Sequence, residues 1–187
     1  MAPPGPAEII SSLRGAIRLL RRDTGGFGDF NLTPEGFWHS FFAIVLVLPM
    51  VAFALHTLAP ADGPAPAAMV GRKSSILILQ WGVFATLMLA LTDALNLQKN
   101  YVSFIVTYNW CSVLGVGLQM VPVLLCSMKI IDQSLAQLIV LMVFLGLLPF
   151  FWFVSREALG TTGGVAAGVV AVDQLLQIAL EYSFGLR

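Results

Sequence analysis

The stretch GVVAVDQLLQIAL, residues 168–180, lies inside an apolar segment that runs from about residue 163 to 184. A transmembrane helix needs about 20 consecutive, predominantly apolar residues, and this segment has that length. Four more such segments precede it, at about 37–58, 75–95, 102–128 and 135–154. The sequence therefore predicts an all-α fold, a polytopic transmembrane bundle of five helices within residues 31–187.

The composition is also that of a membrane protein. Of the 187 residues, 58% are hydrophobic and only 11% are charged, whereas soluble proteins carry about 25% charged residues. The mean hydropathy is +0.87. Ten basic and ten acidic residues cancel, so no net field points to a nucleic acid as partner. The expected partners are the lipid bilayer and other proteins, or further copies of this chain, in the membrane.

The N-terminal segment, residues 1–30, has the pattern of an amphipathic helix. At about 100° per residue, apolar side chains fall in one sector and basic side chains in the adjoining one. The apolar set is Ile9, Ile10, Leu13, Ile17 and Leu20, and the basic set is Arg14, Arg18, Arg21 and Arg22. This pattern favours a helix in the headgroup plane whose arginines face anionic lipid. The alternatives are a solvated helix and an arm that packs on the protein's own cytoplasmic face.

The basic residues also predict the orientation. With the N-terminus inside, six Lys and Arg residues lie on the cytoplasmic side and four lie outside. The positive-inside rule then favours a cytoplasmic N-terminus. The linker APADGPAPAAMVGRKS, residues 59–74, is rich in Pro, Gly and Ala and is expected to continue neither flanking helix.

Asp173 is the most informative residue, because a carboxylate inside a span costs roughly 2.5–3.5 kcal/mol on insertion scales. It can carry a proton or bind a cation in a pathway. It can instead be a protonated acid that hydrogen-bonds Asn109, Gln119 or Gln80 on another helix. A third role is pairing with a charge on a separate subunit, since no Lys or Arg of this chain is expected at the same depth. The hydrogen-bonded structural role is favoured.

The last span carries further polar and small residues. On a helical wheel, Asp173 and Gln177 share one face, and Gly164 and Gly168 lie close to the opposite face. A GxxxG pair lets a neighbouring helix approach closely. We therefore expect this helix to be packed on two sides, with Asp173 facing the interior of the bundle.

A second polar cluster, TYNWCSVLG, occupies residues 107–115 near the start of the third span. Asn109 is expected to hydrogen-bond a neighbouring helix. Tyr108 and Trp110, on either side of it, are interpreted as an aromatic pair at the membrane interface.

Enzyme motifs are absent from the sequence, which has no Walker A, GxGxxG, GxSxG or HExxH pattern. His39 and His56 lie about 25 Å apart along a helix, too far apart to share a metal. Cys111 and Cys126 are about 22 Å apart along another, too far apart for a disulfide. We expect no catalytic activity, no cofactor and no metal site.

The order of the segments resembles bacterial members of the Yip1-like family, in which a short basic amphipathic segment precedes five closely spaced spans. The stretches GAIRLLRRDTGGFGDFNLTPEGFWHSFFA, residues 15–43, and YNW, residues 108–110, resemble a set of alphaproteobacterial inner-membrane proteins. The DLYGP-like run of eukaryotic Yip1 proteins is missing, so neither their trafficking role nor any functional residue is transferred. The resemblance implies the five-span fold, a bacterial inner membrane and a membrane-organising role.

Two functions fit these patterns. The favoured one is a non-catalytic scaffold or accessory subunit of a larger membrane complex, whose helices are bonded through Asp173, Gln177, Asn109 and Gln119. The alternative is a small transporter or channel subunit in which Asp173 binds a proton or cation. Five spans make a thin bundle for a monomeric pathway, so the alternative implies an oligomer.

Overall fold

A computed structural model describes residues 3–59 and 66–184 of the chain. Within these ranges the chain forms seven α-helices and two short 3-10 helices, with no strand. In chain order these are α1 (Pro6–Leu20), η1 (Thr24–Asp29), α2 (Pro34–Ser40), α3 (Ala43–Leu58), α4 (Pro66–Ala94), η2 (Gln98–Asn100), α5 (Tyr101–Ser127), α6 (Gln133–Leu159) and α7 (Gly163–Ser183).

Side-chain caps fix where several helices begin. The Thr33 hydroxyl accepts a hydrogen bond from the backbone N–H of Gly36 at 3.1 Å, and Pro34 occupies the first turn of α2, where its missing N–H has no cost. Asp132 caps α6 in the same way. The helix α6 ends at Leu159 and is followed by Gly160, whose φ of 60° is in the left-handed region that glycine adopts without strain.

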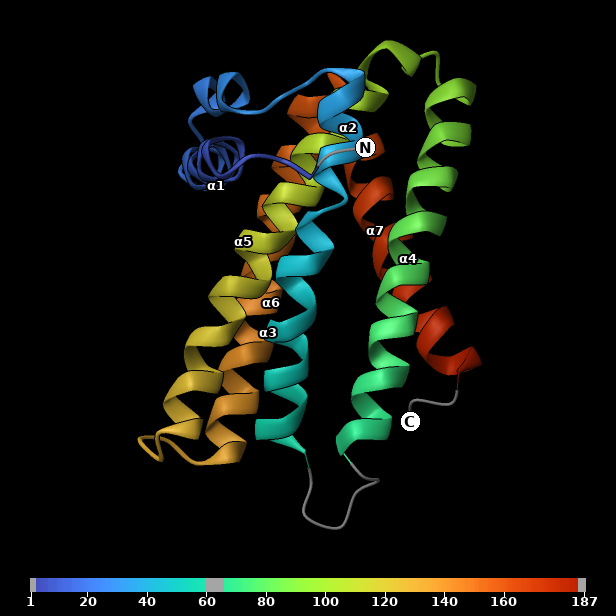
Figure 1. The fold of residues 1–187 in the computed structure, drawn as a ribbon. Helices are drawn as coiled ribbons and strands as arrows, with labels where there is room; N and C mark the ends of the chain where they lie inside the picture. Colours follow the sequence, from blue (N-terminus) through green and yellow to red (C-terminus); the bar gives the residue numbers. More distant parts are fainter. Residues whose placement is uncertain (1–2, 60–65, 185–187) are drawn as a thin grey trace.

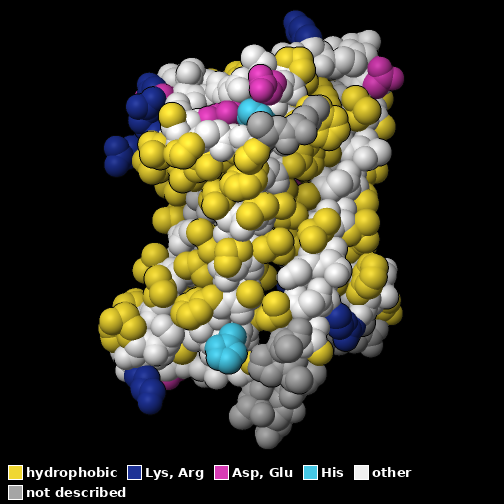
Figure 2. Space-filling model, viewed as in Figure 1, with side chains coloured by type: hydrophobic (Ala, Val, Ile, Leu, Met, Phe, Trp, Pro, Cys, Tyr) yellow, Lys and Arg dark blue, Asp and Glu magenta, His cyan; other side chains and the backbone are white. Residues whose placement is uncertain are grey.

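Five helical segments are long and apolar enough to cross a membrane, which confirms the predicted fold class. The first combines α2 and α3, which meet at Phe41 and Phe42, and the others are α4, α5 with η2, α6 and α7. Hydrophobic side chains cover the middle of the visible face, whereas charged side chains gather near its two ends (Figure 2). This distribution matches a bilayer core between two polar interfaces, so the chain is an integral membrane protein.

The membrane-spanning helices form a ring, in which α3 packs on α5, α5 on α6, α6 on α7, α7 on α4 and α4 on α3 (Figure 1). The helix α5 contributes most to the buried core. Its first half contains Phe104, Ile105, Val106 and Trp110, which are at most 1% exposed. Packing is therefore tight around the first half of α5.

The helix α4 differs from expectation. It begins at Pro66, nine residues before the expected start of the second span, so residues 66–74 are helical and not part of a linker. Proline is tolerated in the first turn because no intrahelical partner is needed for its nitrogen. The early start places Lys73 within the helix, about two turns from Gln80.

The N-terminal helix α1 lies against the side of the bundle, nearer to the end at which α2 begins, and packs on η1 and α5 (Figure 1). Ala16 and Leu19 are fully buried in this packing. Arg14 and Arg18 pair with Asp29, at 2.5 and 2.9 Å, in place of the lipid-facing role expected of them. The structure thus supports the alternative in which the N-terminal helix is an arm that packs on the protein itself. Lipid contact by the remaining exposed face stays a prediction.

The other two predicted basic residues follow α1. Arg22 donates to the backbone oxygen of Pro149 at 3.2 Å, and its guanidinium lies 4.5 Å from the centre of the Phe153 ring. Both contacts are to α6, so Arg22 fastens the N-terminal segment to the bundle. Arg21 is exposed, so of the four arginines it has the position that best suits a lipid headgroup.

Candidate functional site

Asp173, near the middle of α7, is held by three hydrogen-bond donors. The Tyr108 hydroxyl of α5 donates to its Oδ2 at 2.7 Å, and Gln80 Nε2 of α4 donates to its Oδ1 at 3.2 Å. Gln174, the next residue in the chain, donates to Oδ2 at 3.2 Å. The carboxyl group therefore ties α7 to both α4 and α5. Of the three partners considered from the sequence, the structure places only Gln80 beside it.

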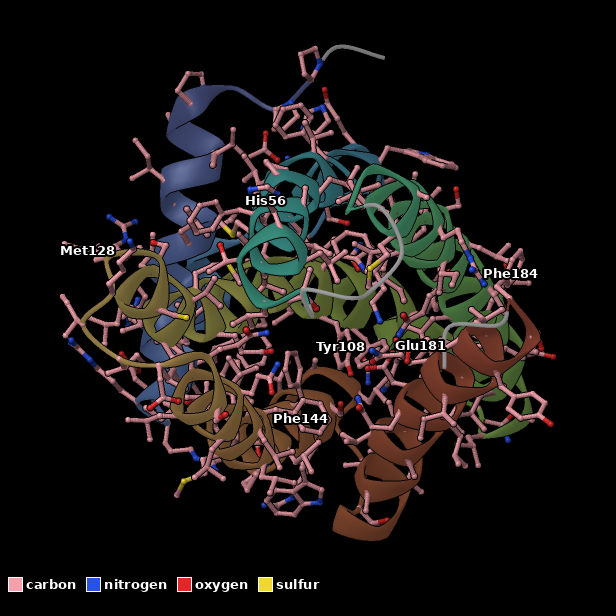
Figure 3. The ribbon with its side chains drawn as sticks, turned by 90° about the horizontal axis from the view of Figure 1, so that it is seen from below. His56, Tyr108, Met128, Phe144, Glu181 and Phe184 are labelled. Atoms are coloured by element: carbon pink, nitrogen blue, oxygen red, sulfur yellow. The ribbon has the colours of Figure 1, made fainter. Side chains whose placement is uncertain are left out.

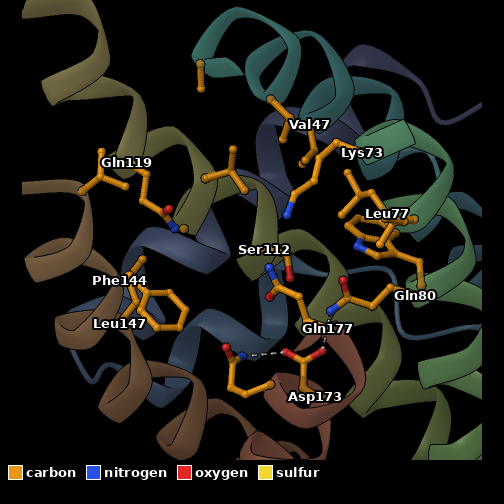
Figure 4. A pocket seen from close by; sticks show the side chains of 18 of the residues that line it. Val47, Lys73, Leu77, Gln80, Ser112, Gln119, Phe144, Leu147, Asp173 and Gln177 are labelled. Atoms are coloured by element: carbon orange, nitrogen blue, oxygen red, sulfur yellow. Dashed lines mark hydrogen bonds between the residues drawn. The ribbon is translucent and has the colours of Figure 1, made fainter. Parts of the chain in front are cut away.

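A cavity of about 460 Å³ lies beside Asp173, in the centre of the helix ring. All five membrane helices α3 to α7 contribute to its walls, and most of the lining side chains are apolar. Lys73, Gln119 and Gln177 reach into the same space from α4, α5 and α7 (Figure 4). The cavity thus combines apolar walls with a few convergent polar groups, the usual make-up of a small-molecule site.

The cavity reaches the end of the bundle at which α3 ends and α4 begins. Leu58, Ala59 and Glu181 line it there. Figure 3 looks along the bundle from this end, with Tyr108, Phe144 and Glu181 placed around the interior. Asp173 lies eight residues before Glu181 on α7. The polar centre at Asp173 is therefore set back from Glu181, and from this end, by about two turns of the helix.

An aromatic cluster closes the opposite side of the cavity. The ring of Tyr108 lies 5.2 Å from those of Phe84 and Phe104 and 5.0 Å from that of Phe151, measured between centroids. Phe84, Phe104 and Tyr108 are at most 5% exposed. Tyr108 thus belongs both to the aromatic cluster and to the polar centre. Its ring helps to close the cavity, and its hydroxyl donates to Asp173.

A second polar group lies nearer the outer end of the cavity. Lys73 of α4 forms an ion pair with Glu181 of α7, and Gln177 donates to the same Glu181 oxygen at 3.2 Å. Arg72 donates to the backbone oxygen of Phe184. Gln177 is therefore part of this outer group and does not bond Asp173.

Asn109 and Gln119 do not join either group. Asn109 Nδ2 donates to the Ser40 hydroxyl of α2 at 3.0 Å, so it bonds a neighbouring helix as expected. Gln119 lines the cavity. Tyr108 and Trp110 are 5% and 1% exposed, so their interpretation as an interfacial aromatic pair is wrong. Both rings are buried in the core because the first half of α5 packs closely on its neighbours.

Gly164 and Gly168 lie on an exposed face of α7. A Cβ atom built on either residue would meet nothing within 4 Å. The expected packing of a neighbouring helix on this GxxxG pair is therefore wrong for helices of the same chain. Trp152 of α6 packs instead beside Gly163, and its Nε1 donates to the Gly163 oxygen at 2.9 Å.

The described residues contain no group of three or more His, Cys, Asp or Glu side chains arranged to hold a metal ion. Comparison with family models, with curated proteins and with solved structures finds no match to this chain. The resemblance to the bacterial Yip1-like family therefore stays a prediction.

Proposed function

We propose that this protein is a small transport protein, or the subunit of one, that takes up a proton or cation at Asp173. The observation that carries the proposal is a half-buried carboxyl group set at the inner part of a cavity that reaches one end of the bundle. Intramembrane carboxylates that face a cavity commonly mark ion or proton pathways.

The cavity is what favours transport over a purely structural role for Asp173. Protein interiors are packed to a density of about 0.74–0.76, with few voids larger than a water molecule. A carboxyl group that only joins helices needs its donors and no open space. The space of about 460 Å³ beside Asp173 instead falls in the range of ligand sites, about 300–1,000 Å³.

The proposal includes a bacterial inner membrane and a cytoplasmic N-terminus. The six basic residues on the N-terminal side, against four on the other, support this orientation. The chain enters α2 from the N-terminal side, so the end at which α3 stops faces outward in this arrangement. The cavity then opens to the outer side, and the aromatic cluster around Tyr108 closes it toward the cytoplasm.

The test is flux in proteoliposomes, read as proton uptake or as cation uptake under an imposed membrane potential. We expect the wild-type protein to support uptake and Asp173→Asn to reduce it at least about tenfold, because the amide cannot ionise. Asp93→Asn is the matched control. Asp93 is at the exposed end of α4, bonded to Gln98 at 2.8 Å and remote from the cavity, so uptake is unchanged.

Flux no greater than that of empty vesicles, or equal flux in the wild type and in Asp173→Asn, would contradict the proposal. The purified variants are first compared by size-exclusion chromatography in mild detergent, so that loss of folding is recognised. Asp173→Ala removes the hydrogen bonds as well as the charge. It is expected to destabilise the bundle by about 1–2 kcal/mol more than Asp173→Asn does.

The second candidate function is that of an accessory subunit, and the outward face of α7 favours it. Gly164 and Gly168 leave room for another helix to approach, and no helix of this chain occupies it within the described residues. Purification from native membranes in mild detergent, with the mass of the complex measured, distinguishes the cases. A stoichiometric foreign chain supports the accessory role, whereas a homo-oligomer supports transport.

A further inference from the structure

We propose that the ligand of this cavity is an organic amine carrying a single positive charge on an apolar body, and that its ammonium group binds Asp173. The proposal rests on the transport function above and names its substrate class. Charge, hydrogen-bonding capacity and the nature of the walls each point to this class.

The charge of the inner part of the cavity fits one positive group. Among the described lining residues, Asp173 is the only Asp, Glu, Lys or Arg at that depth. Lys73 and Glu181, the other charged lining residues, neutralise one another in an ion pair. Glu181 is eight residues from Asp173, about 12 Å along the helix. An anion placed beside Asp173 is repelled, and a monocation is attracted with little competition.

The Asp173 carboxylate has room for one more donor. Each carboxylate oxygen offers about two acceptor positions. Oδ2 accepts from Tyr108 and Gln174, whereas Oδ1 accepts from Gln80 as its one hydrogen bond within the described part of the chain. The remaining position on Oδ1 suits an N–H group, and the charge-assisted bond that forms is stronger than a neutral one.

The walls favour an organic cation over an inorganic ion. Hard cations such as Ca²⁺ need six or more oxygen ligands, or must retain their water shell. Apart from the polar groups named above, the walls of the cavity are mainly rings and aliphatic side chains, including Phe84, Trp81, Phe144 and Leu147. Aromatic faces attract cations by roughly 0.5–2 kcal/mol, and apolar walls gain from burying an apolar body.

The cavity volume also fits a whole molecule. A space of about 460 Å³ lies in the range that encloses drug-sized ligands. Because the polar centre is set back from the outer end, an ammonium group at Asp173 leaves its apolar body between α3, α5 and α6, against residues such as Val51 and Val116. The ligand therefore enters with its charged group leading.

The experiment uses three probes with the same ring and different charge: naphthylmethylamine, which is protonated at neutral pH, neutral naphthylmethanol and anionic naphthoate. Binding to the purified full-length protein in mild detergent is followed by naphthalene fluorescence. We expect the amine to bind at least about tenfold more tightly than the alcohol, and naphthoate to bind most weakly. Asp173→Asn is expected to abolish the preference for the amine, whereas Asp93→Asn retains it.

A second measurement needs no variant. An apolar carbodiimide is allowed to modify Asp173 in the wild-type protein, and modification is quantified by mass spectrometry. The amine is expected to slow the modification of Asp173 at concentrations at which the alcohol has no effect. This measurement remains valid even where Asp173→Asn does not fold.

The outcomes separate the two proposals. Equal binding of amine and alcohol, or no protection of Asp173 by the amine, overturns the substrate class. If Asp173-dependent proton uptake persists in that case, the transport function stands without it. If uptake is also independent of Asp173, both proposals fail. Amine binding and protection without uptake of protons, of cations or of naphthylmethylamine itself into proteoliposomes support the ligand site and overturn transport.

Discussion

Asp29, in the turn that follows α1, shows how an ion pair outside the membrane makes a local structure depend on pH. Its side chain is 9% exposed and accepts hydrogen bonds from Arg14 at 2.5 Å and from Arg18 at 2.9 Å. These two bonds lower the pKa of Asp29 below its ordinary value of 3.8. Asp23, bonded to Arg18 at 2.7 Å, likewise has a lowered pKa.

A lowered pKa means that the folded segment binds its proton less readily than the unfolded one. The ion pairs therefore contribute stability above about pH 4, and this contribution is lost as the pH falls through the pKa of the folded state. We expect hydrogen exchange across residues 6–30, corrected for the intrinsic effect of pH, to be constant from pH 7 to 5 and to accelerate below pH 4. Asp29→Asn is expected to exchange faster at neutral pH and to respond less to acid. An identical pH response in this variant would show that Asp29 is not responsible.

At the scale of elements, the contact between α1 and η1 depends on two glycines. A Cβ atom built on Gly26 would lie 2.7 Å from the Gly15 oxygen, and one built on Gly15 would lie 2.8 Å from the Gly26 oxygen. Both neighbours are backbone atoms, which cannot rotate away as the end of a long side chain can. The two elements can therefore pack this closely only with glycine at both positions.

We expect Gly26→Ala to destabilise the N-terminal segment by about 1–3 kcal/mol, as overpacked sites commonly do. Gly28→Ala is the matched control, because a Cβ atom there meets nothing within 4 Å. Limited proteolysis between α1 and α2 is the measurement, and only Gly26→Ala should be cleaved faster than the wild type. Equal cleavage of both alanine variants would contradict the close contact.

At the scale of the whole molecule, the ring of helices separates an inner surface, which lines the cavity, from an outer surface that faces lipid. Gln119 on α5 lines the cavity, eight residues before the end of the helix at Ser127. Leu141 on α6 is 51% exposed on the outside, eight residues after the helix start at Gln133. Both positions therefore lie about 12 Å from the same end of the bundle.

Cysteine substitutions at Gln119 and Leu141 test which of the two surfaces is accessible to water. In a Cys126→Ser background, with Cys111 fully buried, we expect Gln119→Cys to react with a charged, membrane-impermeant thiol reagent at least about tenfold faster than Leu141→Cys. With the proposed orientation, the reagent acts from the side opposite the N-terminus. Faster reaction at residue 141, or reaction at residue 119 only from the N-terminal side, would contradict the inferred arrangement.

Only part of the candidate site could be predicted from the sequence. Asp173, Gln177 and Glu181 recur at intervals of four residues, which places all three on one face of α7, and Lys73 and Gln80 are two turns apart on α4. These spacings were sufficient to indicate two facing polar stripes. Their pairing was missed because Lys73 was assigned to the proline-rich linker, residues 59–74, and not to a helix. Tyr108 was missed because an aromatic ring near a helix end is usually interfacial.

The class of the protein, the number of spans and the presence of a carboxyl group, Asp173, inside a span could all be predicted from the sequence alone. These follow from local properties, because about 20 apolar residues suffice to define a span and a carboxyl group within one is costly wherever it points. The tertiary structure alone decided the cavity, the aromatic cluster that closes it and the partners of each polar group. These depend on how five similar apolar helices rotate and pack, and lipid and protein interior are too alike in polarity for hydropathy to distinguish the faces.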